Sequence, residues 1–199
     1  MRILLIRHGR TEANERLLYY GRTDLPLSEG GREDLRAMGE AGGYPDITGL
    51  RVYTSGMRRT EETLEVLFGE REHTPIPAFR EMDFGDFEMR AYEELKEDPA
   101  FLAWCEGDNE SNVAPGGESG KQSQARAIAG FEELCRRGED FLLVAHGGPI
   151  AAIMKHLFPE EGKTWFQWMT GNGMGFGIEL DGDKKSWYTV PTEGEEYGG

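Results

Sequence analysis

The chain has 199 residues, of which 38% are hydrophobic and 30% are charged, with a formal net charge of −15. This length and composition predict one compact globular domain, and the negative charge argues against nucleic acid or an anionic membrane surface as a partner. Apolar runs fall far short of the ~20 residues that span a bilayer, and the N-terminus lacks the cleavage signature of a signal peptide, so we expect a soluble, cytoplasmic protein.

Strand and helix patterns alternate along the first 80 residues. Short runs rich in β-favouring residues predict strands at residues 2–7, 51–55 and 75–79, the last as an edge strand because it contains prolines. Helices are expected between these strands. The first follows Ser28 as its N-cap and stops at Gly42 or Gly43, and the second ends at Gly69.

The second half of the chain continues this alternation after an irregular segment. Residues 86–115 contain short helical pieces, aromatic residues and a polar run, which indicates a lid insertion within a single domain of residues 1–190. The elements predicted after it are a helix at 118–137, a strand at 140–148, a helix at 149–158 and a hairpin at 175–190 turned at Asp181-Gly182. The tail, residues 191–199, is expected to be disordered.

This order of elements predicts an α/β fold, a three-layer sandwich with a mostly parallel central sheet and helices on both faces. In such sheets ligands bind at the carboxyl ends of the strands. The first predicted strand ends in Arg7 and His8, the second leads into the arginines at 58 and 59, the third is followed by Glu81, and a later strand ends in His146. These side chains are expected to converge on one edge of the sheet.

Such a set of side chains suits phosphoryl transfer. A phosphoryl group gains from positive donors around its oxygens in the transition state, and the planar guanidinium group fits phosphate. One neutral imidazole can attack phosphorus while the other, protonated, stabilises the oxygens. A carboxylic acid can protonate the leaving alkoxide and then take a proton from water. The set predicts phosphomonoester hydrolysis through a phosphohistidine, with no requirement for a metal or another cofactor.

Six segments within the first 150 residues carry a more specific pattern, and they are LIRHGRTEAN, YGRTDLPLSEGGR, VYTSGMRRTEET, FREMDFGDFE, PGGES and VAHGG. In this order they resemble the signatures of the histidine phosphatase superfamily, which has the phosphoglycerate mutase-like fold. The resemblance implies that His8 is the phosphorylated nucleophile and that Arg7, Arg59 and His146 hold the phosphoryl group.

The resemblance also assigns the proton donor and the substrate side of the site. Glu81 matches the family's proton donor, while Asp83 and Glu88 in the same carboxylate-rich loop are alternative candidates. The residues implied to line the phosphate and substrate side are Asn14, Tyr20, Gly21, Arg22 and Gly147. Arg10 departs from the family pattern, in which this position is commonly acidic or small and polar, and we expect it to face solvent or the rim.

Phosphoglycerate mutases share the catalytic set, so a mutase is the main alternative function. Mutases carry an insertion with further basic residues that grip a second acidic group, whereas residues 86–115 here contain only Arg90 and Lys96 as cations. Gly147-Gly148 also stands where mutases typically have Gly-Asn. Both features favour water as the phosphoryl acceptor. Within the phosphatase branch, the segments look most like the α-ribazole phosphatases and their broad-specificity relatives.

Two further alternatives concern other classes of protein. The GGESGK segment is reminiscent of a P-loop, but Pro115 and Gln122 occupy positions that the motif requires as Gly and Ser or Thr. A non-catalytic phospho-ligand binding module is disfavoured because every residue with a chemical role is kept. The lid aromatics Phe84, Phe87, Tyr92, Phe101 and Trp104 are expected mostly to form the lid's own core, or alternatively to cover an aromatic leaving group.

The remaining histidines and the cysteines carry no predicted chemistry. His73 and His156 match no motif and are expected to be structural. Cys105 and Cys135 lack the spacing of a zinc site and are expected to be small buried side chains. The expected partner is a small phosphorylated metabolite, and the sequence leaves the choice between monomer and homodimer open.

Overall fold

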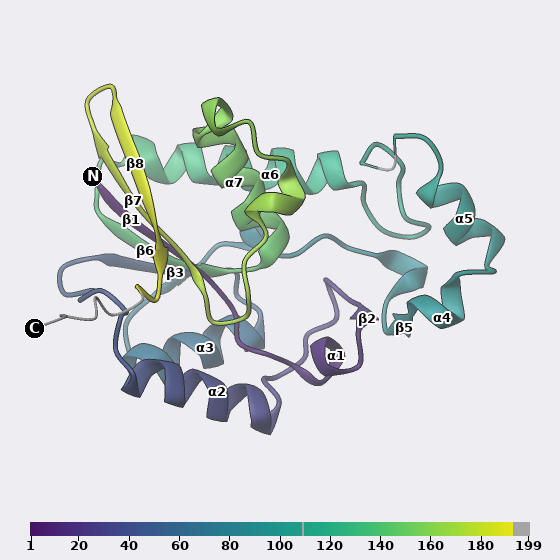
Figure 1. The fold of residues 1–199 in the computed structure, drawn as a ribbon, viewed down its shortest axis with the longest axis horizontal. Helices are drawn as coiled ribbons and strands as arrows, with labels where there is room; N and C mark the ends of the chain where they lie inside the picture. Colours follow the sequence, from purple (N-terminus) through teal and green to yellow (C-terminus); the bar gives the residue numbers. More distant parts are fainter. Residues whose placement is uncertain (109, 193–199) are drawn as a thin grey trace, which may run out of the picture.

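A computed structural model describes residues 1–108 and 110–192. It contains a six-stranded sheet in the order β4-β3-β6-β1-β7-β8 (Figure 1). The parallel strands are β1 (Arg2–Arg7), β3 (Arg51–Thr54), β4 (Thr74–Pro75) and β6 (Phe141–Ala145). In the terminal hairpin, β7 (Gly175–Asp181) pairs antiparallel with β1, and β8 (Lys184–Val190) pairs antiparallel with β7. The predicted α/β fold with a mostly parallel sheet is therefore confirmed.

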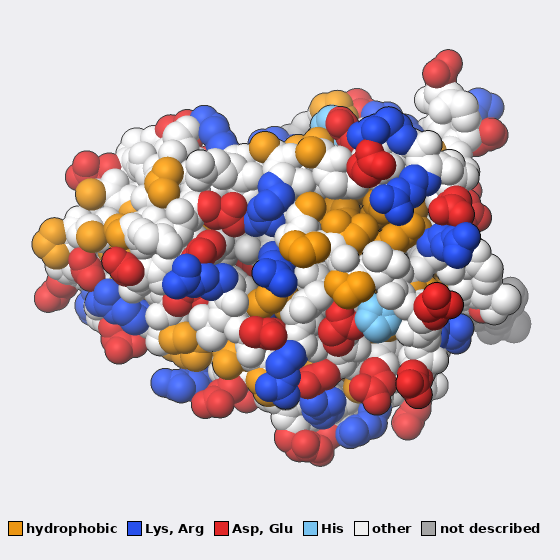
Figure 2. Space-filling model, turned by 180° about the vertical axis from the view of Figure 1, so that it is seen from behind, with side chains coloured by type: hydrophobic (Ala, Val, Ile, Leu, Met, Phe, Trp, Pro, Cys, Tyr) orange, Lys and Arg blue, Asp and Glu red, His pale blue; other side chains and the backbone are white. Residues whose placement is uncertain are grey.

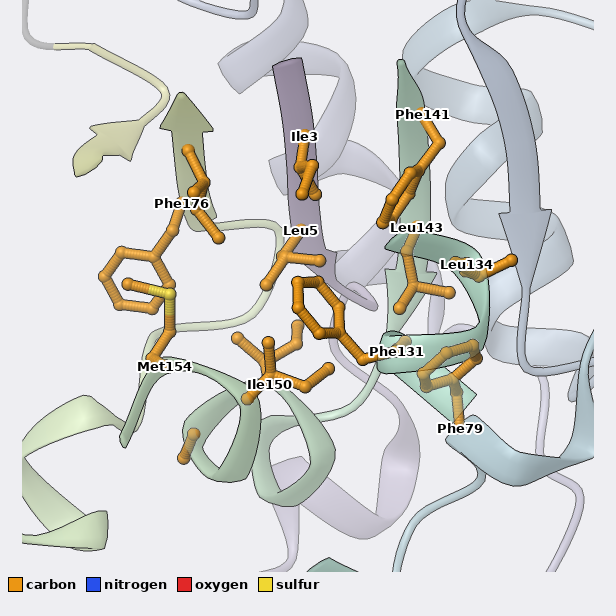
Figure 3. Close-up of a cluster of buried hydrophobic side chains, with 14 of the residues drawn as sticks. Ile3, Leu5, Phe79, Phe131, Leu134, Phe141, Leu143, Ile150, Met154 and Phe176 are labelled. Carbon is orange, nitrogen blue, oxygen red and sulfur yellow. The ribbon is translucent and has the colours of Figure 1, made fainter. Parts of the chain in front are cut away.

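Side chains of β1 alternate between two hydrophobic cores, one on each face of the sheet. Ile3 and Leu5 pack with residues of α6 (Gly120–Arg136) and α7 (Gly147–Leu157), as Figure 3 shows. Leu4 and Ile6 point to the other face and pack with α3 (Arg58–Phe68), beside which α2 (Glu29–Glu40) lies. Because the sheet is covered on both faces, β1 is a continuous apolar run. The run places Arg7 and His8 at the first polar positions after the core.

The segment predicted to be a lid projects from one end of the sheet and has a small core of its own (Figure 1). Its elements are η2 (Gly85–Phe87), β5 (Arg90–Ala91), α4 (Tyr92–Leu95) and α5 (Pro99–Cys105). Phe87 and Phe101 are fully buried in this core, while Tyr92 is exposed. The short strand β2 (Leu18–Tyr19), which follows α1 (Glu12–Glu15), pairs with β5 and ties the lid to the main body.

Several predicted elements are confirmed, and two differ from the prediction. Ser28 caps α2 by accepting a hydrogen bond from the Gly31 N–H at 3.0 Å. The strand predicted at 75–79 is wrong beyond Pro75, because Pro77–Phe79 form a 3₁₀-helix, η1, with proline at its start. The β7–β8 turn lies one residue later than predicted, since Asp181 pairs with Lys184 and leaves Gly182-Asp183 as the loop.

The cysteines were expected to be buried and the tail to be disordered, and the structure differs in part. Cys105 is exposed at the end of α5 and Cys135 is half-buried, so the predicted burial is wrong for Cys105. The buried residue of α5 is Phe101, whereas Cys105, the last residue of this helix, is exposed. The N–H of Thr192 donates to the Gly43 carbonyl at 2.9 Å. The rest of the tail, residues 193–199, lies outside the described residues, so its predicted disorder is untested.

The two edges of the sheet differ in length. β4 has two residues, of which Pro75 has no N–H to donate. On the other side β8 has seven residues, and the first two, Lys184 and Lys185, are exposed. Basic and acidic side chains are interspersed over the face seen in Figure 2. Among the described residues, none of the helices has the length and apolar character that crossing a membrane requires.

Candidate active site

The two histidines predicted to be catalytic lie side by side at the carboxyl ends of neighbouring strands. β1 and β6 are paired in parallel, with Arg7 opposite Ala145, so His8 and His146 follow these strands at the same level. Both side chains are buried, and their ring centroids are 5.1 Å apart at an interplanar angle of 62°. The parallel register thus brings together two imidazoles that are 138 positions apart in the chain.

The hydrogen bond of His8 defines which nitrogen is available. Its Nδ1 lies 2.7 Å from the carbonyl oxygen of Gly9, and because a carbonyl only accepts, Nδ1 carries the proton. The lone pair of the neutral ring is then on Nε2. Burial, followed by the charges of Arg59 and Arg7, lowers the pKa of His8 well below its ordinary value. The ring is therefore neutral near pH 7 and has the form that a nucleophile needs.

Two arginines lie beside the imidazoles without a carboxylate partner. Arg59 is fully buried and donates to the carbonyls of Gly21 at 2.7 Å and Thr23 at 3.0 Å. Its guanidinium carbon lies 4.9 Å from the centre of the Tyr20 ring. Arg7 donates to the carbonyl of Thr170 at 2.5 Å. Within the described part of the chain neither guanidinium forms a salt bridge, so their charges are directed at the site itself.

Buried polar nitrogens without a partner concentrate at this place. Four such side-chain nitrogens occur among the described residues, and three of them are Arg7 Nε, Arg59 Nε and His146 Nδ1. An unpaired buried polar group costs free energy, so such groups usually have a partner. Three around one imidazole define a binding site for an anion with several oxygens, such as a phosphoryl group.

Glu81 supplies the carboxyl group of the site. Its Oε1 accepts from the N–H of Met82 at 3.0 Å, and its Oε2 accepts from the N–H of Gly148 at 3.1 Å. The alternative Glu88 is occupied elsewhere, because it accepts hydrogen bonds from the backbone of residues 21–23 and of Phe84. Glu81 lines the cavity described below, whereas Asp83 and Glu88 do not.

The glycine at position 148 makes room for this carboxyl group. A Cβ built on Gly148 would lie 2.3 Å from Glu81 Oε1, which is too close for any real contact. We expect Gly148→Ala to keep the fold, since the flexible Glu81 side chain can move, and to lower kcat on alkyl phosphates roughly 10²-fold through its misplacement. Steady-state kinetics and thermal melting test this. Gly39→Ala, a helical glycine with space for a methyl group, is the control, and equal losses in both variants would contradict the explanation.

A cavity of about 440 Å³ opens in front of His8. Arg7, Arg59 and Glu81 line one part of it. The wall of the remaining part is mostly apolar. Its large apolar side chains are those of Leu18, Tyr19, Met82, Phe84, Trp104, Trp165, Phe166 and Met169, and Cys105, Glu110, Ser123 and Gln124 also line it. The cavity thus joins a charged end, suited to a phosphoryl group, to an apolar end of a size that fits a small organic group.

The residues expected on the substrate side divide into two groups. Asn14 and Tyr20 line the cavity and are joined by a 2.8 Å hydrogen bond. Gly21 contributes its carbonyl to Arg59, and a Cβ there would lie 1.6 Å from the Met82 oxygen. Arg22 is not among the cavity-lining residues; it is mostly exposed and pairs with Asp83 at 3.2 Å.

Gly147 lies against Arg7, whereas Arg10 lies outside the cavity wall. A Cβ at Gly147 would lie 2.7 Å from the Met169 methyl group and 3.4 Å from Arg7, so glycine allows Arg7 to approach α7. Arg10 pairs with Asp34 at 2.6 Å and lies outside the cavity wall, at the half-exposed position expected for it. His73 and His156 pair with Glu61 and Glu132 away from the site.

Two kinds of residue at this site were not predicted from the sequence. The 3₁₀-helix η4 (Trp165–Trp168) and the residue after it supply Trp165, Phe166 and Met169 to the cavity wall. Ser55 contacts His146, as described below. The density of aromatic residues in the WFQW segment was the available signal for the first group. No group of three or more His, Cys, Asp or Glu in the described residues is placed to hold a metal ion.

Two buried imidazoles, two guanidinium groups without carboxylate partners and one carboxyl group, all at the strand ends of an α/β sheet, define an enzyme that handles phosphate esters. The family follows from comparison with known proteins. The chain belongs to the histidine phosphatase superfamily (branch 1), whose family model matches residues 3–190. It is thus an enzyme, a phosphatase, and the family and fold inferred from the sequence are confirmed.

Individual relatives place it among both phosphatases and mutases. It is 28% identical to the adenosylcobalamin/alpha-ribazole phosphatase of Escherichia coli (strain K12) over 191 residues, which cover 91% of each chain. It is 32% identical to a 2,3-bisphosphoglycerate-dependent phosphoglycerate mutase of Nitrobacter winogradskyi, over 80% of this chain and 83% of the mutase. The crystal structure of a putative alpha-ribazole-5'-P phosphatase from Escherichia coli matches with a TM-score of 0.83 at 25% identity, over 94% of both chains.

Proposed function

We propose that this protein hydrolyses small phosphomonoesters through a phosphohistidine on His8, without a metal ion. The observation that carries the proposal is the set of unpartnered nitrogens on Arg7, Arg59 and His146 around a neutral imidazole whose lone pair is on Nε2. These groups can surround the phosphoryl oxygens while His8 Nε2 approaches phosphorus from the side opposite the leaving group.

In the first half of the reaction, the phosphoryl group moves to the enzyme. A bond forms between His8 Nε2 and phosphorus while the bond from phosphorus to the ester oxygen breaks. Glu81, in its protonated form, gives its proton to the departing oxygen. Arg7 and Arg59 compensate the negative charge on the phosphoryl oxygens throughout. Arg59 is fully buried and Arg7 is half-buried, which makes this stabilisation stronger than it would be in water.

In the second half, water replaces the alcohol. The Glu81 carboxylate takes a proton from a water molecule, the water oxygen bonds to phosphorus, and the bond to His8 Nε2 breaks. The products are inorganic phosphate and the neutral ring of His8, with Glu81 protonated again. The same carboxyl group thus serves first as acid and then as base.

The charges around the cavity favour water over a second acidic substrate as acceptor. Among the described residues that line the cavity, the cations are Arg7 and Arg59, and both are used by the phosphoryl group. The two cations of the lid are paired within it, Arg90 with Asp98 at 3.0 Å and Lys96 with Glu93 at 2.5 Å. A substrate carboxylate, such as that of a phosphoglycerate, would meet Glu81 and Glu110 instead of a cation.

The apolar wall of the cavity favours a substrate whose leaving group is uncharged and flat. We propose that residues 86–115 act as a lid over the bound ester. Trp104 of this lid and Phe84, which packs against the lid core, form one side of the wall. Trp165 and Phe166 contribute from η4, with ring centroids 5.0 Å apart. An aromatic group can pack against such rings. A nucleoside-like phosphate with an aromatic base, including the α-ribazole phosphate named for relatives, is therefore our leading candidate.

Substrate selection can be tested at Phe166, which lines the cavity although 73% of its surface is exposed. We expect Phe166→Ala to lower kcat/KM for aryl and nucleoside phosphates by about three- to tenfold, because an aromatic contact contributes ~0.5–1.5 kcal/mol. The value for glycerol phosphate should stay unchanged. Leu102→Ala, an exposed apolar residue outside the cavity wall, is the control. Equal losses for all esters would contradict an aromatic subsite.

The function itself is tested by two assays on the purified protein in the presence of a chelator. A panel of phosphomonoesters ranked by kcat/KM should show hydrolysis, with aromatic leaving groups preferred. Isomerisation of 3-phosphoglycerate with a bisphosphate primer should be absent or far slower than hydrolysis. Efficient isomerisation would instead identify a mutase, and binding of esters without any turnover would identify a binding module.

A further inference from the structure

Two hydroxyl groups, those of Ser55 and Thr60, form a hydrogen-bonded chain with His146, and neither residue lines the cavity. The Oγ of Ser55 is 2.8 Å from His146 Nε2 and 3.1 Å from the Oγ1 of Thr60. The Oγ1 of Thr60 is in turn 2.7 Å from the carbonyl oxygen of Met57. Ser55 and Thr60 are fully buried, so water does not compete for these bonds.

The direction of every hydrogen bond in this chain follows from its last member. The Met57 carbonyl can only accept, so Thr60 spends its single hydroxyl hydrogen on it. The contact between Ser55 and Thr60 is then a hydrogen bond only if Ser55 donates its hydrogen to Thr60, which leaves the Ser55 oxygen as an acceptor. The N–H of Met57 also points to this oxygen, at 3.4 Å. Nε2 of His146 therefore carries a hydrogen and donates it to Ser55.

Placing the hydrogen of His146 on Nε2 determines the state of the other ring nitrogen, Nδ1. A neutral His146 with its hydrogen on Nε2 has a lone pair on Nδ1, the buried atom that has no partner among the described residues. A lone pair repels a phosphoryl oxygen, so this tautomer cannot bind a fully ionised phosphate. Nδ1 becomes a donor only when the ring takes up a second proton, or when the phosphate brings a proton of its own.

We infer that Ser55 and Thr60 are positioning residues that make phosphate binding depend on one extra proton, held between His146 Nδ1 and a phosphoryl oxygen. This inference rests on the proposed function, since it gives His146 its place in the phosphoryl pocket. In the bound state Nδ1 and the phosphoryl oxygen share the proton of a phosphate monoanion. No covalent bond other than that to this proton changes.

The groups around His146 explain why the free ring does not hold this proton. Those that face it are His8 and Arg7 from the end of β1, Arg59 from α3 and Arg126 from α6. The pKa of His146 is lowered well below its ordinary value, mainly by burial and next by the charge of Arg59. The Glu81 carboxyl group accepts a hydrogen bond from the N–H of Gly148, two residues after His146. The proton therefore arrives with the ligand.

Binding of inorganic phosphate at different pH values tests this inference directly. For the wild type, we expect the dissociation constant to rise about tenfold per pH unit once the pH exceeds the second ionisation of phosphate. In Ser55→Ala, His146 can place its hydrogen on Nδ1 and bind the dianion, so the constant should stay nearly level over the same range. Isothermal titration calorimetry gives both curves.

Thr60 offers a second test that does not touch the imidazole. In Thr60→Val the hydroxyl hydrogen of Ser55 loses its acceptor and turns to His146 Nε2, which moves the ring hydrogen to Nδ1. We expect Thr60→Val to flatten the pH curve as Ser55→Ala does, and Thr60→Ser to restore the wild-type slope. Thr54→Val is the matched control, because its buried hydroxyl bonds Glu61 rather than His146. ¹⁵N NMR of His146 reports the tautomer in each protein.

The outcomes separate this inference from the proposed function. Equal slopes in wild type, Ser55→Ala and Thr60→Val, with hydrolysis still dependent on His8, would overturn the role of the hydroxyl chain and leave the phosphatase intact. An NMR spectrum with the hydrogen of wild-type His146 on Nδ1 would overturn it as well. Loss of hydrolysis in the wild type, or hydrolysis that does not need His8, would instead overturn the proposed function.

Discussion

Replacing His8 by alanine is expected to reduce hydrolysis of p-nitrophenyl phosphate on the order of 10⁴-fold or more, because no nucleophile remains to accept the phosphoryl group. The fold should be preserved, since the imidazole makes a single hydrogen bond, to Gly9. Arg7, Arg59 and His146 stay in place, so the variant should still bind phosphate. Kinetics in the presence of a chelator, combined with calorimetric phosphate binding, measure both properties.

The covalent intermediate gives this prediction a second readout. Acid-free quenching of the wild type during turnover should yield a protein heavier by one phosphoryl group, with the modification on residue 8 and labile in acid. His8→Ala should carry none. His156→Ala, in a surface pair with Glu132, is the control and should behave as the wild type. Turnover by His8→Ala within about tenfold of the wild type would rule out His8 as the nucleophile.

Replacing Glu81 by glutamine is expected to have an effect that depends on the leaving group. For alkyl phosphates kcat/KM should fall by about 10²–10⁴-fold, because the departing alkoxide then has no acid to protonate it. For p-nitrophenyl phosphate, whose leaving group is stable as an anion, the loss should be less than about tenfold. The ratio kcat/KM is the right measure, since it reports the steps up to formation of the phosphoenzyme.

The control for this variant is another carboxylate of the same cavity. Glu110 lines the cavity wall, and Glu110→Gln should lower neither value selectively. A loss in Glu81→Gln that is the same for good and poor leaving groups would mean that Glu81 organises the start of α7 through Gly148 rather than donating a proton. In that case Gly148→Ala should show the same uniform loss.

The charged part of the site could be predicted because strand ends are visible in a sequence. The apolar run of β1 ends at Arg7, and the parallel register of β1 with β6 then brings His8 and His146 together. A charged or polar side chain directly after a buried strand costs free energy unless it has a partner, and a bound anion is such a partner. Spacing alone left Glu81, Asp83 and Glu88 as rivals for the proton donor. We favour Glu81 because it lines the cavity, whereas Asp83 and Glu88 do not and Glu88 bonds the backbone.

The apolar wall and the hydroxyl chain could not be predicted in this way. Trp165 and Phe166 reach the cavity from a 3₁₀-helix, a short element without a regular hydrophobic period. Ser55 and Thr60 are small polar residues of a kind that usually marks a turn or a helix start. Their function depends on the directions of three hydrogen bonds, and these directions exist only in the folded chain.

The unequal edges of the sheet limit how copies of this protein can associate. Extension of the sheet by a second chain needs a row of free N–H and C=O groups. β4 offers two residues, one of them a proline, whereas β8 offers seven. Strand addition is therefore disfavoured at β4, and β8 is the edge that presents such a row to a second chain.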